Sequence, residues 1–451
     1  MPDPQPPQPP DPEGRPLQEP TDIDRPASAS PTEPEMEAEA IGVAHDPYAA
    51  LRYRDARLYM GGALLEIVGS QIQTVALMWE LFQRTGSPLT LGWVGGVQAI
   101  PMLLLTLPAG YLADIVSRRL LVVVSQVGQV AASLWLAYLS WHTGSVALML
   151  TAIGLGAIFQ ALGSPARSAM LPSLVPPSVF PNAKAWSSSS FQVASVGGPA
   201  LGAFVLSMLG APWAYVTAAV FSLIYAINTM QVNPRPFDRG VREPMMKSLS
   251  EGLRFVWNTK IILATITLDL FAVLLGGAVY LLPIFASERL HVGEYGFAFL
   301  RAAPAVGAFV TAMIIAHTPP FKRAGRAMLL AVAGFGAATI VFGLSTNYWL
   351  SLAMIALTGA FDNVSVVVRH TLVQVMTPDR MRGRVSAVNN VFIGASNEIG
   401  GFESGVTAAW LGAVRSVVFG GIGTILVVAA VAMKWPQVRN FGSLKDAKPA
   451  Q

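Results

Sequence analysis

Residues 260–286 read KIILATITLDLFAVLLGGAVYLLPIFA, an apolar run interrupted by a single acid, Asp269. A helix needs about 20 mostly apolar residues to cross the hydrocarbon layer of a bilayer, which is ~30 Å thick. Only helices and closed barrels satisfy their backbone hydrogen bonds inside that layer. Residues 260–286 are therefore expected to form a membrane-spanning helix.

Stretches of the same character lie on both sides of this one. The first six predicted spans cover residues 57–82, 91–112, 119–140, 145–166, 185–208 and 212–232. The second six cover residues 260–286, 293–316, 327–346, 348–369, 385–411 and 415–435. The sequence therefore predicts an all-α polytopic membrane protein with twelve transmembrane helices.

The composition agrees with this class. Of the 451 residues, 53% are hydrophobic and 12% are charged, whereas about 25% of the residues in a typical soluble domain are charged. The net charge of +4 does not suggest a nucleic-acid partner, and the absence of cysteine excludes disulfides and thiolate metal sites. No phosphate-binding glycine-lysine loop and no zinc-protease motif is present. We therefore expect no enzyme activity, no cofactor, no metal and no ATP-driven pumping.

The predicted spans divide the chain into domains. The segment Met1 through Asp46 is rich in proline and acids and lacks the pattern of a signal peptide, and such a composition favours disorder. The prediction is a disordered cytoplasmic tail over 1–50, a six-helix bundle over 51–232, a cytoplasmic linker over 233–259, a second six-helix bundle over 260–437 and a cytoplasmic tail over 438–451.

The connections between the spans alternate between basic and nearly uncharged. Arg118 and Arg119 lie in one of the basic connections, as do Lys322, Arg323 and Arg326 in another. Cationic loops stay in the cytoplasm. We therefore expect a plasma (inner) membrane protein with both termini in the cytoplasm, as an even number of spans requires.

Two similar halves are indicated by a repeated segment. Residues 167–176 read RSAMLPSLVP, and residues 369–378 read RHTLVQVMTP, with arginine and proline nine positions apart in both. The helix spacing repeats at the same offset. Two similar six-helix halves are typical of transporters whose substrate site lies between the halves near the bilayer midplane. Access to the site would alternate as one half rocks against the other.

Residues 110–119, GYLADIVSRR, resemble the loop signature of the major facilitator superfamily, and they lie between the second and third predicted spans, as in that family. The resemblance implies a cytoplasmic gate formed by Gly110, Asp114, Arg118 and Arg119. Gly110 permits close helix approach, and Asp114 can pair with a cation or a helix N-terminus. The alternative is that the arginines only anchor the loop.

Three further segments resemble the branch that contains the enterobactin exporter and macrolide efflux proteins. Residues 194–203, ASVGGPALGA, resemble the antiporter motif of drug-efflux members through Gly198, Pro199 and Gly202, although alanine replaces two of the usual glycines. Residues 377–385, TPDRMRGRV, and 394–405, GASNEIGGFESG, are the other two. The loop signature in the second half consists of Pro378, Asp379, Arg382, Gly383 and Arg384. This resemblance implies a monomer that exports amphipathic small molecules or siderophores, usually in exchange for protons.

The structural effect of the motif in the fifth span has two interpretations. Proline removes one hydrogen bond of a helix and clashes with the preceding turn, so Gly198-Pro199 could kink the span where it seals the cavity. The alternative is ordinary packing, because glycine and proline are frequent in transmembrane helices.

Polar residues inside the spans are the candidates for a proton and substrate pathway. Tyr59, Glu66, Gln73 and Glu80 recur every seven residues, which places them on one helix face, and we expect this face to line the central cavity. The pathway candidates are Glu66, Gln73, Asp269, Arg301, Asp362, Asn397, Glu398 and Glu403.

A carboxylate at the membrane centre costs at least ~2.5 kcal/mol, so it persists there when it is paired, protonated or in contact with water. Desolvation favours the protonated form of a carboxylate, which permits proton exchange with substrate. The structural alternative is an ion pair between helices, for example Asp269 or Asp362 with Arg301.

We expect a secondary active transporter that exports small amphipathic compounds, drug-like molecules or siderophores, by proton-coupled alternating access. Its partners are the lipid bilayer, the small-molecule substrate and protons. The alternatives are an importer or a lipid transporter of the same fold, or a membrane sensor or scaffold that does not transport.

Overall fold

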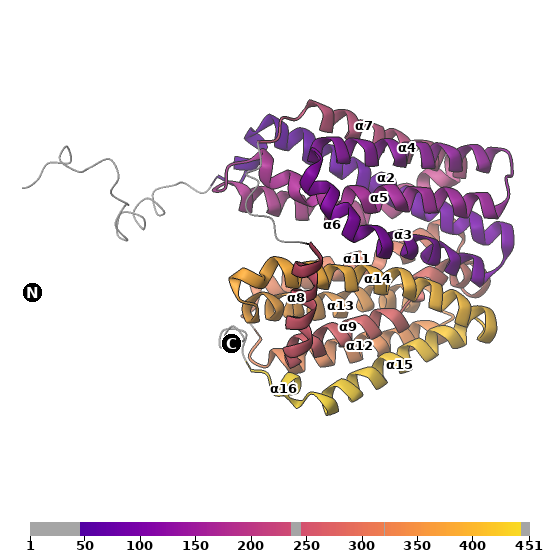
Figure 1. Cartoon of the computed structure of the whole chain (residues 1–451). Helices are drawn as coiled ribbons and strands as arrows, with labels where there is room; N and C mark the ends of the chain where they lie inside the picture. The colour runs from indigo at the N-terminus through magenta and orange to yellow at the C-terminus, as the bar shows by residue number, and fades with distance from the viewer. Residues whose placement is uncertain (1–45, 236–244, 320, 443–451) are drawn as a thin grey trace, which may run out of the picture. The chain divides into compact units, whose positions relative to one another are not determined.

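The computed structural model describes residues 46–235, 245–319 and 321–442, and every regular element within these ranges is helical (Figure 1). Most of the predicted N-terminal tail and the last residues of the C-terminal tail lie outside the described residues. The all-α prediction is confirmed for the described part of the chain.

The helices of the first predicted bundle are α2 (Arg54–Thr85), α3 (Pro88–Ile115), α4 (Arg118–Trp141), α5 (Val146–Leu174), α6 (Phe180–Leu209) and α7 (Ala211–Gln231). A short 3₁₀ helix, η2 (Ala49–Arg52), precedes them. The later helices are α8 (Met245–Asn258), α9 (Lys260–Leu275), α11 (Gly293–His317), α12 (Ala324–Leu344), α13 (Tyr348–Met376), α14 (Asp379–Leu411), α15 (Ala413–Lys434) and α16 (Pro436–Arg439). Each of the predicted spans falls on one or more of these helices.

Within the described residues, ten helical segments are long and apolar enough to cross a membrane. The helices α2 and α14 are not among them, although they contain 32 and 33 residues. Both carry polar residues in the middle of their length, which lowers their hydropathy. The multi-span membrane fold is thus confirmed, and the number of twelve spans stays a prediction.

The seventh predicted span is not one continuous helix. Its apolar length, Lys260–Arg289, consists of α9, the 3₁₀ turn η3 (Ala278–Leu281), α10 (Leu282–Ile284) and the π-helical turn η4 (Phe285–Arg289). The break falls at Gly276 and Gly277, because glycine is a poor helix former. A Cβ atom on Gly277 would collide with Ser404 Oγ, so the broken segment packs directly against α14.

Contacts between helices are concentrated within two groups. In the first, α2 packs against α6 and α7, and α4 packs against α5 and α7. In the second, α11 packs against α13, α12 packs against α13 and α15, and α14 packs against α9. The two groups meet where α3 contacts α14 and where α6 contacts α11 (Figure 1).

The region predicted as a linker contains the helix α8. Figure 1 shows α8 running across the ends of α9 and α14. Val256 is buried in a cluster with Ile262, Val385 and Val388. The apolar side of α8 therefore packs on the second group of helices.

The chain is also packed at the borders of the predicted tails. The backbone N–H of Ala50 donates to Asn182 Oδ1 at 2.9 Å, and Ala50 is fully buried. The backbone N–H of Ala324 donates to the carbonyl of Gly442 at 2.9 Å. Residues at both borders therefore belong to the packed part of the chain.

Candidate functional site

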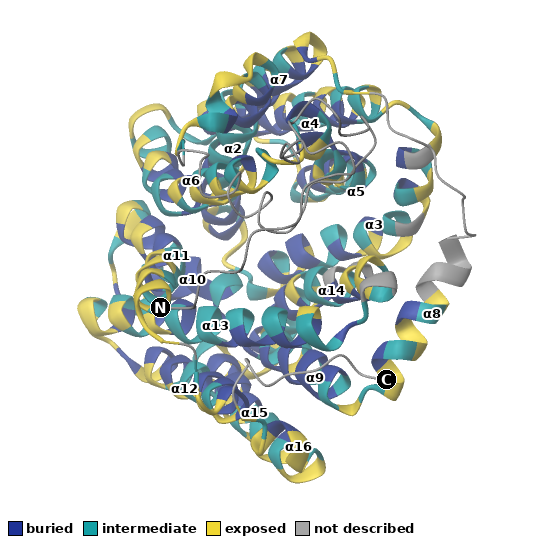
Figure 2. Cartoon of the chain, turned by 90° about the vertical axis from the view of Figure 1, so that its left-hand side faces the viewer, coloured by how far each residue is buried: buried dark blue, intermediate teal, exposed yellow. Residues whose placement is uncertain are grey.

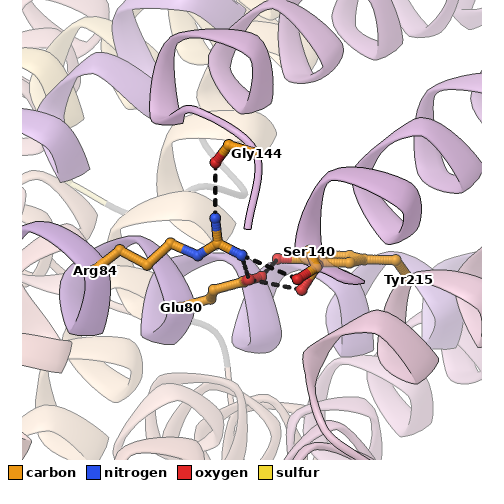
Figure 3. A network of polar contacts seen from close by, with 5 residues as sticks. All are labelled: Glu80, Arg84, Ser140, Gly144 and Tyr215. Carbon is orange, nitrogen blue, oxygen red and sulfur yellow. Dashed lines mark hydrogen bonds and ion pairs between the residues drawn. The ribbon is translucent and has the colours of Figure 1, made fainter. Parts of the chain in front are cut away.

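A polar network surrounds Glu80 near the end of α2 (Figure 3). The Tyr215 hydroxyl donates to Glu80 Oε2 at 2.7 Å, and the Ser140 hydroxyl donates to Oε1 at 2.6 Å. Arg84 Nη2 lies 2.5 Å from Oε1, and Arg84 Nη1 donates to the carbonyl of Gly144 at 2.9 Å. Through this network Glu80 links α2, α4 and α7.

The rest of the predicted polar face of α2 also meets neighbouring helices. Gln73 Oε1 accepts a hydrogen bond from Ser133 of α4 at 2.6 Å. The Tyr59 hydroxyl donates to the carbonyl of Arg167 in α5 at 2.8 Å. At Tyr59, Gln73 and Glu80 the polar face therefore connects helices of the first group, which differs from the expected cavity lining.

Glu66 is the most open acid of this face. Its Oε1 lies 3.6 Å from Arg167 Nη1, and the two side chains are 18% and 19% exposed. The same arginine donates from Nη2 to the carbonyl of Gln160 at 3.2 Å. Glu66 and Arg167 thus form a loose ion pair between α2 and α5, and this pair keeps some access to the surroundings.

Asp269 forms an ion pair with Arg369, which joins α9 to α13. Both residues are buried, with exposed fractions of 7% and 2%. The Nε atom of Arg369 has no hydrogen-bond partner among the described residues. The suggested pairing of Asp269 with Arg301 is therefore replaced by one with Arg369, whose position on α13 brings it to α9.

Arg301 belongs to a different cluster. The Tyr280 hydroxyl donates to Glu398 Oε2 at 2.7 Å. Arg301 of α11 interacts electrostatically with both Glu398 and Tyr280. The cluster brings together α11, η3 and α14, and it contains two of the predicted pathway residues.

The remaining pathway candidates have weak or local contacts. Asp362 of α13 is half-buried, and it makes no hydrogen bond or ion pair with any other described residue. Asn397 is exposed and donates to the carbonyl of Ile393 in its own helix at 2.9 Å. Glu403 accepts a 3.5 Å hydrogen bond from its neighbour Ser404. Neither Asp362 nor Glu403 thus has a charged partner among the described residues, and Asp362 lacks a hydrogen bond as well.

The predicted gate motif lies at the turn from α3 to α4. Arg118 Nη1 donates to the carbonyl of Ala169 in α5 at 3.2 Å. Arg119 Nη1 donates to the carbonyl of Val232, after α7, at 3.2 Å. Gly110 and Asp114 lie in the last turns of α3, and the side chain of Asp114 is outside the described part. These contacts tie the loop to helices of the first group.

The motif in α6 lies at a close helix crossing. A Cβ atom on Gly198 would lie 2.7 Å from Gln71 Cβ, and one on Gly202 would lie 3.1 Å from Ile72 Cα. Pro199 is buried between these glycines. The two glycines let α6 approach α2 closely, which supports the packing interpretation of this motif.

The second loop signature lies at the start of α14. Pro378 is the residue before the helix, and Arg382 Nε donates to the carbonyl of Gln374 at 3.3 Å. Arg384 forms an ion pair with Glu251 of α8. Gly383 is exposed, and the side chain of Asp379 is not among those described. The signature therefore connects α14 to α8.

Sequence reasoning did not find the partners of Gln73, Glu80 and Glu398, which are Ser133, Ser140, Tyr215 and Tyr280. A hydroxyl inside an apolar helix carries no local signal for a partner more than fifty positions away. Arg167 and Arg369 stood out in the sequence because both begin the repeated segment, but that repeat did not identify their partners. Among the described residues, no group of three or more His, Asp or Glu is placed to hold a metal ion.

Several known proteins resemble this chain in sequence. The profile of a family described as transmembrane secretion effector matches residues 45–450. The chain is 27% identical over 396 residues to the multidrug efflux pump Tap of Mycolicibacterium fortuitum. The matched residues cover 85% of this chain and 96% of Tap. It is 26% identical over 284 residues to the enterobactin exporter EntS of Shigella dysenteriae, covering 63% of this chain and 68% of EntS.

Solved structures share the fold at low identity. A bacterial homologue of the human lysosomal transporter Spinster has a TM-score of 0.68 at 15% identity, covering 88% of this chain and 99% of that one. A D-xylose–proton symporter has a TM-score of 0.66 at 12% identity, covering 89% and 100%. The chain belongs to the transmembrane secretion effector family of the major facilitator superfamily, whose members are multi-span membrane transporters and not enzymes.

Proposed function

We propose that this protein is a secondary active transporter of the plasma (inner) membrane that exports small amphipathic compounds, either drug-like molecules or siderophores. Family membership supports transport. The export direction and the substrate class rest on relatives named as a multidrug efflux pump and an enterobactin exporter. We propose alternating access as the mechanism, proton exchange as the driving force and a monomer as the working unit.

Two ion pairs at corresponding positions of the repeated segments support the proposal of two equivalent halves. Arg167 and Arg369 begin the two copies of the repeated segment. Arg167 pairs with Glu66 on the first long helix of its group, and Arg369 pairs with Asp269 on the first span of the other group. The two groups thus share the spacing of arginine and proline and an ion pair from that arginine to the first helix. This agreement supports twelve spans, of which α2 and α14 are the two that hydropathy alone does not identify.

The orientation follows from the basic helix ends. The helices α2, α4 and α9 begin at Arg54, Arg118 and Lys260. Asp55 Oδ2 accepts a hydrogen bond from the backbone N–H of Asn233 at 3.0 Å, so the start of α2 and the end of α7 lie at one end of the bundle. Because cationic ends stay in the cytoplasm, we assign this end and both termini to the cytoplasmic side.

The opposite, outer end is then the closed one. The rings of Trp79 in α2 and Phe297 in α11 stack with their centroids 5.6 Å apart. Ser207 of α6 is hydrogen-bonded to Tyr295 of α11. These contacts join the two helix groups at the ends remote from Arg118. They support a state in which the substrate site opens toward the cytoplasm.

Proton exchange is assigned to the acids of the pathway. Asp362 has no charged partner among the described residues, and Glu66 and Glu398 have partners that proton binding would release. Substitution of Glu66, Asp269, Asp362 and Glu398 one at a time by the amide is expected to abolish flux driven by a pH gradient in at least one variant. Full activity in all four variants would exclude proton coupling through them.

The gate assignment of Gly110, Asp114, Arg118 and Arg119 is also part of the proposal. The contacts of Arg118 and Arg119 at the cytoplasmic end of α4 support a function in holding the helix ends together. Asp114→Asn is expected to lower transport while membrane abundance stays unchanged. Normal transport by this variant would leave only the anchoring function of the loop.

The test of alternating access uses the absence of cysteine from the chain. The double variant Ser207→Cys/Tyr295→Cys is reconstituted in proteoliposomes and treated with a short, cleavable bifunctional thiol reagent. Cross-linking is expected to stop proton-driven export of a fluorescent dye, and reductive cleavage is expected to restore it. The variant Ser207→Cys alone, treated identically, is the control. Full export by the cross-linked double variant would refute the mechanism.

The same vesicles separate the alternatives. The fold is shared with a D-xylose–proton symporter, so the direction of transport is measured and not taken from the fold. Substrate accumulation against the proposed direction would indicate an importer, and movement of labelled phospholipid would indicate a lipid transporter. A sensor or scaffold would show no substrate-dependent proton movement across any compound panel.

A further inference from the structure

The helix α8 exposes an apolar pair that no other part of the described chain covers. Leu253 is 44% exposed and Trp257 is 69% exposed, and residues four positions apart lie on one face of a helix. Gly252 and Val256, which face α14 and α9, are buried. The exposed pair therefore continues the buried side of α8 outward, away from the helix bundle.

The position of α8 brings this pair to the membrane surface. The helix ends at Asn258, and the apolar span beginning at Lys260 follows directly. Figure 2, which looks onto the end of the bundle, shows α8 at the periphery beside α9 and α14. Tryptophan favours the boundary between headgroups and acyl chains, where one part of its ring system is wet and the other apolar.

A cavity of about 290 Å³ lies between α8 and the start of α14. It is lined by Glu251, Arg254, Phe255, Asn258, Met381 and Arg384. The charge of Glu251 is balanced by Arg384. Arg254 is exposed and makes no ion pair with any other residue that the structure describes. The cavity thus offers a cation without a partner, beside an amide and an aromatic ring.

We propose that α8 is an interfacial helix and that this cavity binds the phosphate of an anionic phospholipid, with Arg254 as the cationic contact. Leu253 and Trp257 lie among the upper parts of the acyl chains, and Arg254 on the adjacent face meets the headgroup. A guanidinium matches the geometry of a phosphate, and an amphipathic helix with this arrangement lies in the plane of the interface. The bound lipid would anchor α8, and with it the segment that connects the two helix groups, at the membrane surface.

The insertion of α8 is tested with an environment-sensitive fluorophore on the full-length chain, which has no natural cysteine. Trp257→Cys and Asn258→Cys are labelled separately and placed in nanodiscs of phosphatidylcholine with phosphatidylglycerol. The label at 257 is expected to emit at shorter wavelength than the label at 258. Leu253→Cys replaces Trp257→Cys if the latter does not fold. Equal emission from both faces of the helix would overturn the proposal.

The headgroup site is tested by native mass spectrometry and thermal stability of the detergent-solubilised protein, titrated with phosphatidylglycerol. Arg254→Gln is expected to weaken lipid binding about fivefold, which corresponds to the ~1 kcal/mol of one basic residue at an anionic surface. The matched control is Arg326→Gln, which removes an exposed arginine at the start of α12.

Three results would contradict the proposed binding site for a phospholipid headgroup. Arg254→Gln would bind phosphatidylglycerol as the unmodified protein does, or Arg326→Gln would lose as much affinity as Arg254→Gln. In the third, inorganic phosphate alone would stabilise the protein in an Arg254-dependent way and phosphatidylglycerol would add nothing. None of these measurements depends on transport, so the lipid site and the proposed export activity are tested separately.

Discussion

Removal of one charge from the buried pair of Asp269 and Arg369 is expected to destabilise the protein strongly. Asp269→Asn keeps the size of the side chain but leaves the guanidinium of Arg369 without its counter-ion. Arg369 is 2% exposed, so water cannot replace the lost partner without opening the packing between α9 and α13. Its Nε already lacks a hydrogen-bond partner among the described residues.

The expected magnitude follows from that burial. Breaking a buried ion pair by removal of one partner costs about 3–5 kcal/mol, because an uncompensated charge remains inside. Replacement of both charges by apolar residues of similar volume is often close to neutral. Asp269→Leu/Arg369→Met is therefore expected to recover most of the free energy of unfolding that Asp269→Asn loses.

The assay is equilibrium unfolding of the reconstituted protein in bicelles. The double variant Asp269→Leu/Arg369→Met and its two single variants, Asp269→Leu and Arg369→Met, form a double-mutant cycle, and Asp269→Asn is measured beside them. Glu403→Gln is the matched control, since this half-buried acid has one 3.5 Å hydrogen bond to Ser404; its cost is expected to be about 1 kcal/mol or less. A change of less than ~1 kcal/mol for Asp269→Asn, the range of an exposed pair, would refute the reasoning.

Three further predictions concern the other contacts. Tyr215→Phe removes a donor to the Glu80 carboxylate and is expected to cost about 1.5–3 kcal/mol of unfolding free energy, the range for hydrogen bonds to charged groups; unchanged thermal unfolding would contradict this. Gly198→Ala places a Cβ 2.7 Å from a side chain on α2 and is expected to cost about 1–3 kcal/mol, whereas Gly197→Ala, which meets nothing within 4 Å, is expected to be neutral or stabilising. Asp362→Asn is expected to retain thermal stability and lose flux driven by a pH gradient in proteoliposomes, and an equal loss of both would indicate a structural role instead.

Hydropathy predicted where helices cross the membrane better than where they end. The fourth predicted span stopped at residue 166, but α5 continues to Leu174 past Pro165 and Pro172. The tenth stopped at residue 369, but α13 continues to Met376. A hydropathy window ends where the hydrocarbon layer ends, whereas backbone hydrogen bonds continue into the aqueous region. The missing turns belong to the two repeated segments, 167–176 and 369–378.

The candidate residues were found more readily than their partners. The seven-residue spacing placed Glu66 and Gln73 on one face of α2, and their observed contacts with α4 and α5 agree with a common polar face. The partner of Asp269 could not be deduced in this way, because Arg369 lies in another span and only the folded chain brings them together. The helix α8 was missed because its apolar positions are mixed with charges, as in any interfacial helix.

The polarity of α2 and α14 also affects how the chain enters the bilayer. The translocon sorts segments by hydropathy, and an acid at the centre of a helix costs about 2.5–3.5 kcal/mol on the insertion scale. Glu66 emerges from the ribosome well before Arg167, and Glu80 emerges well before Tyr215. We therefore expect α2 to wait beside the translocon until α7 has been synthesised, so that the first six helices leave for the lipid together and not one by one.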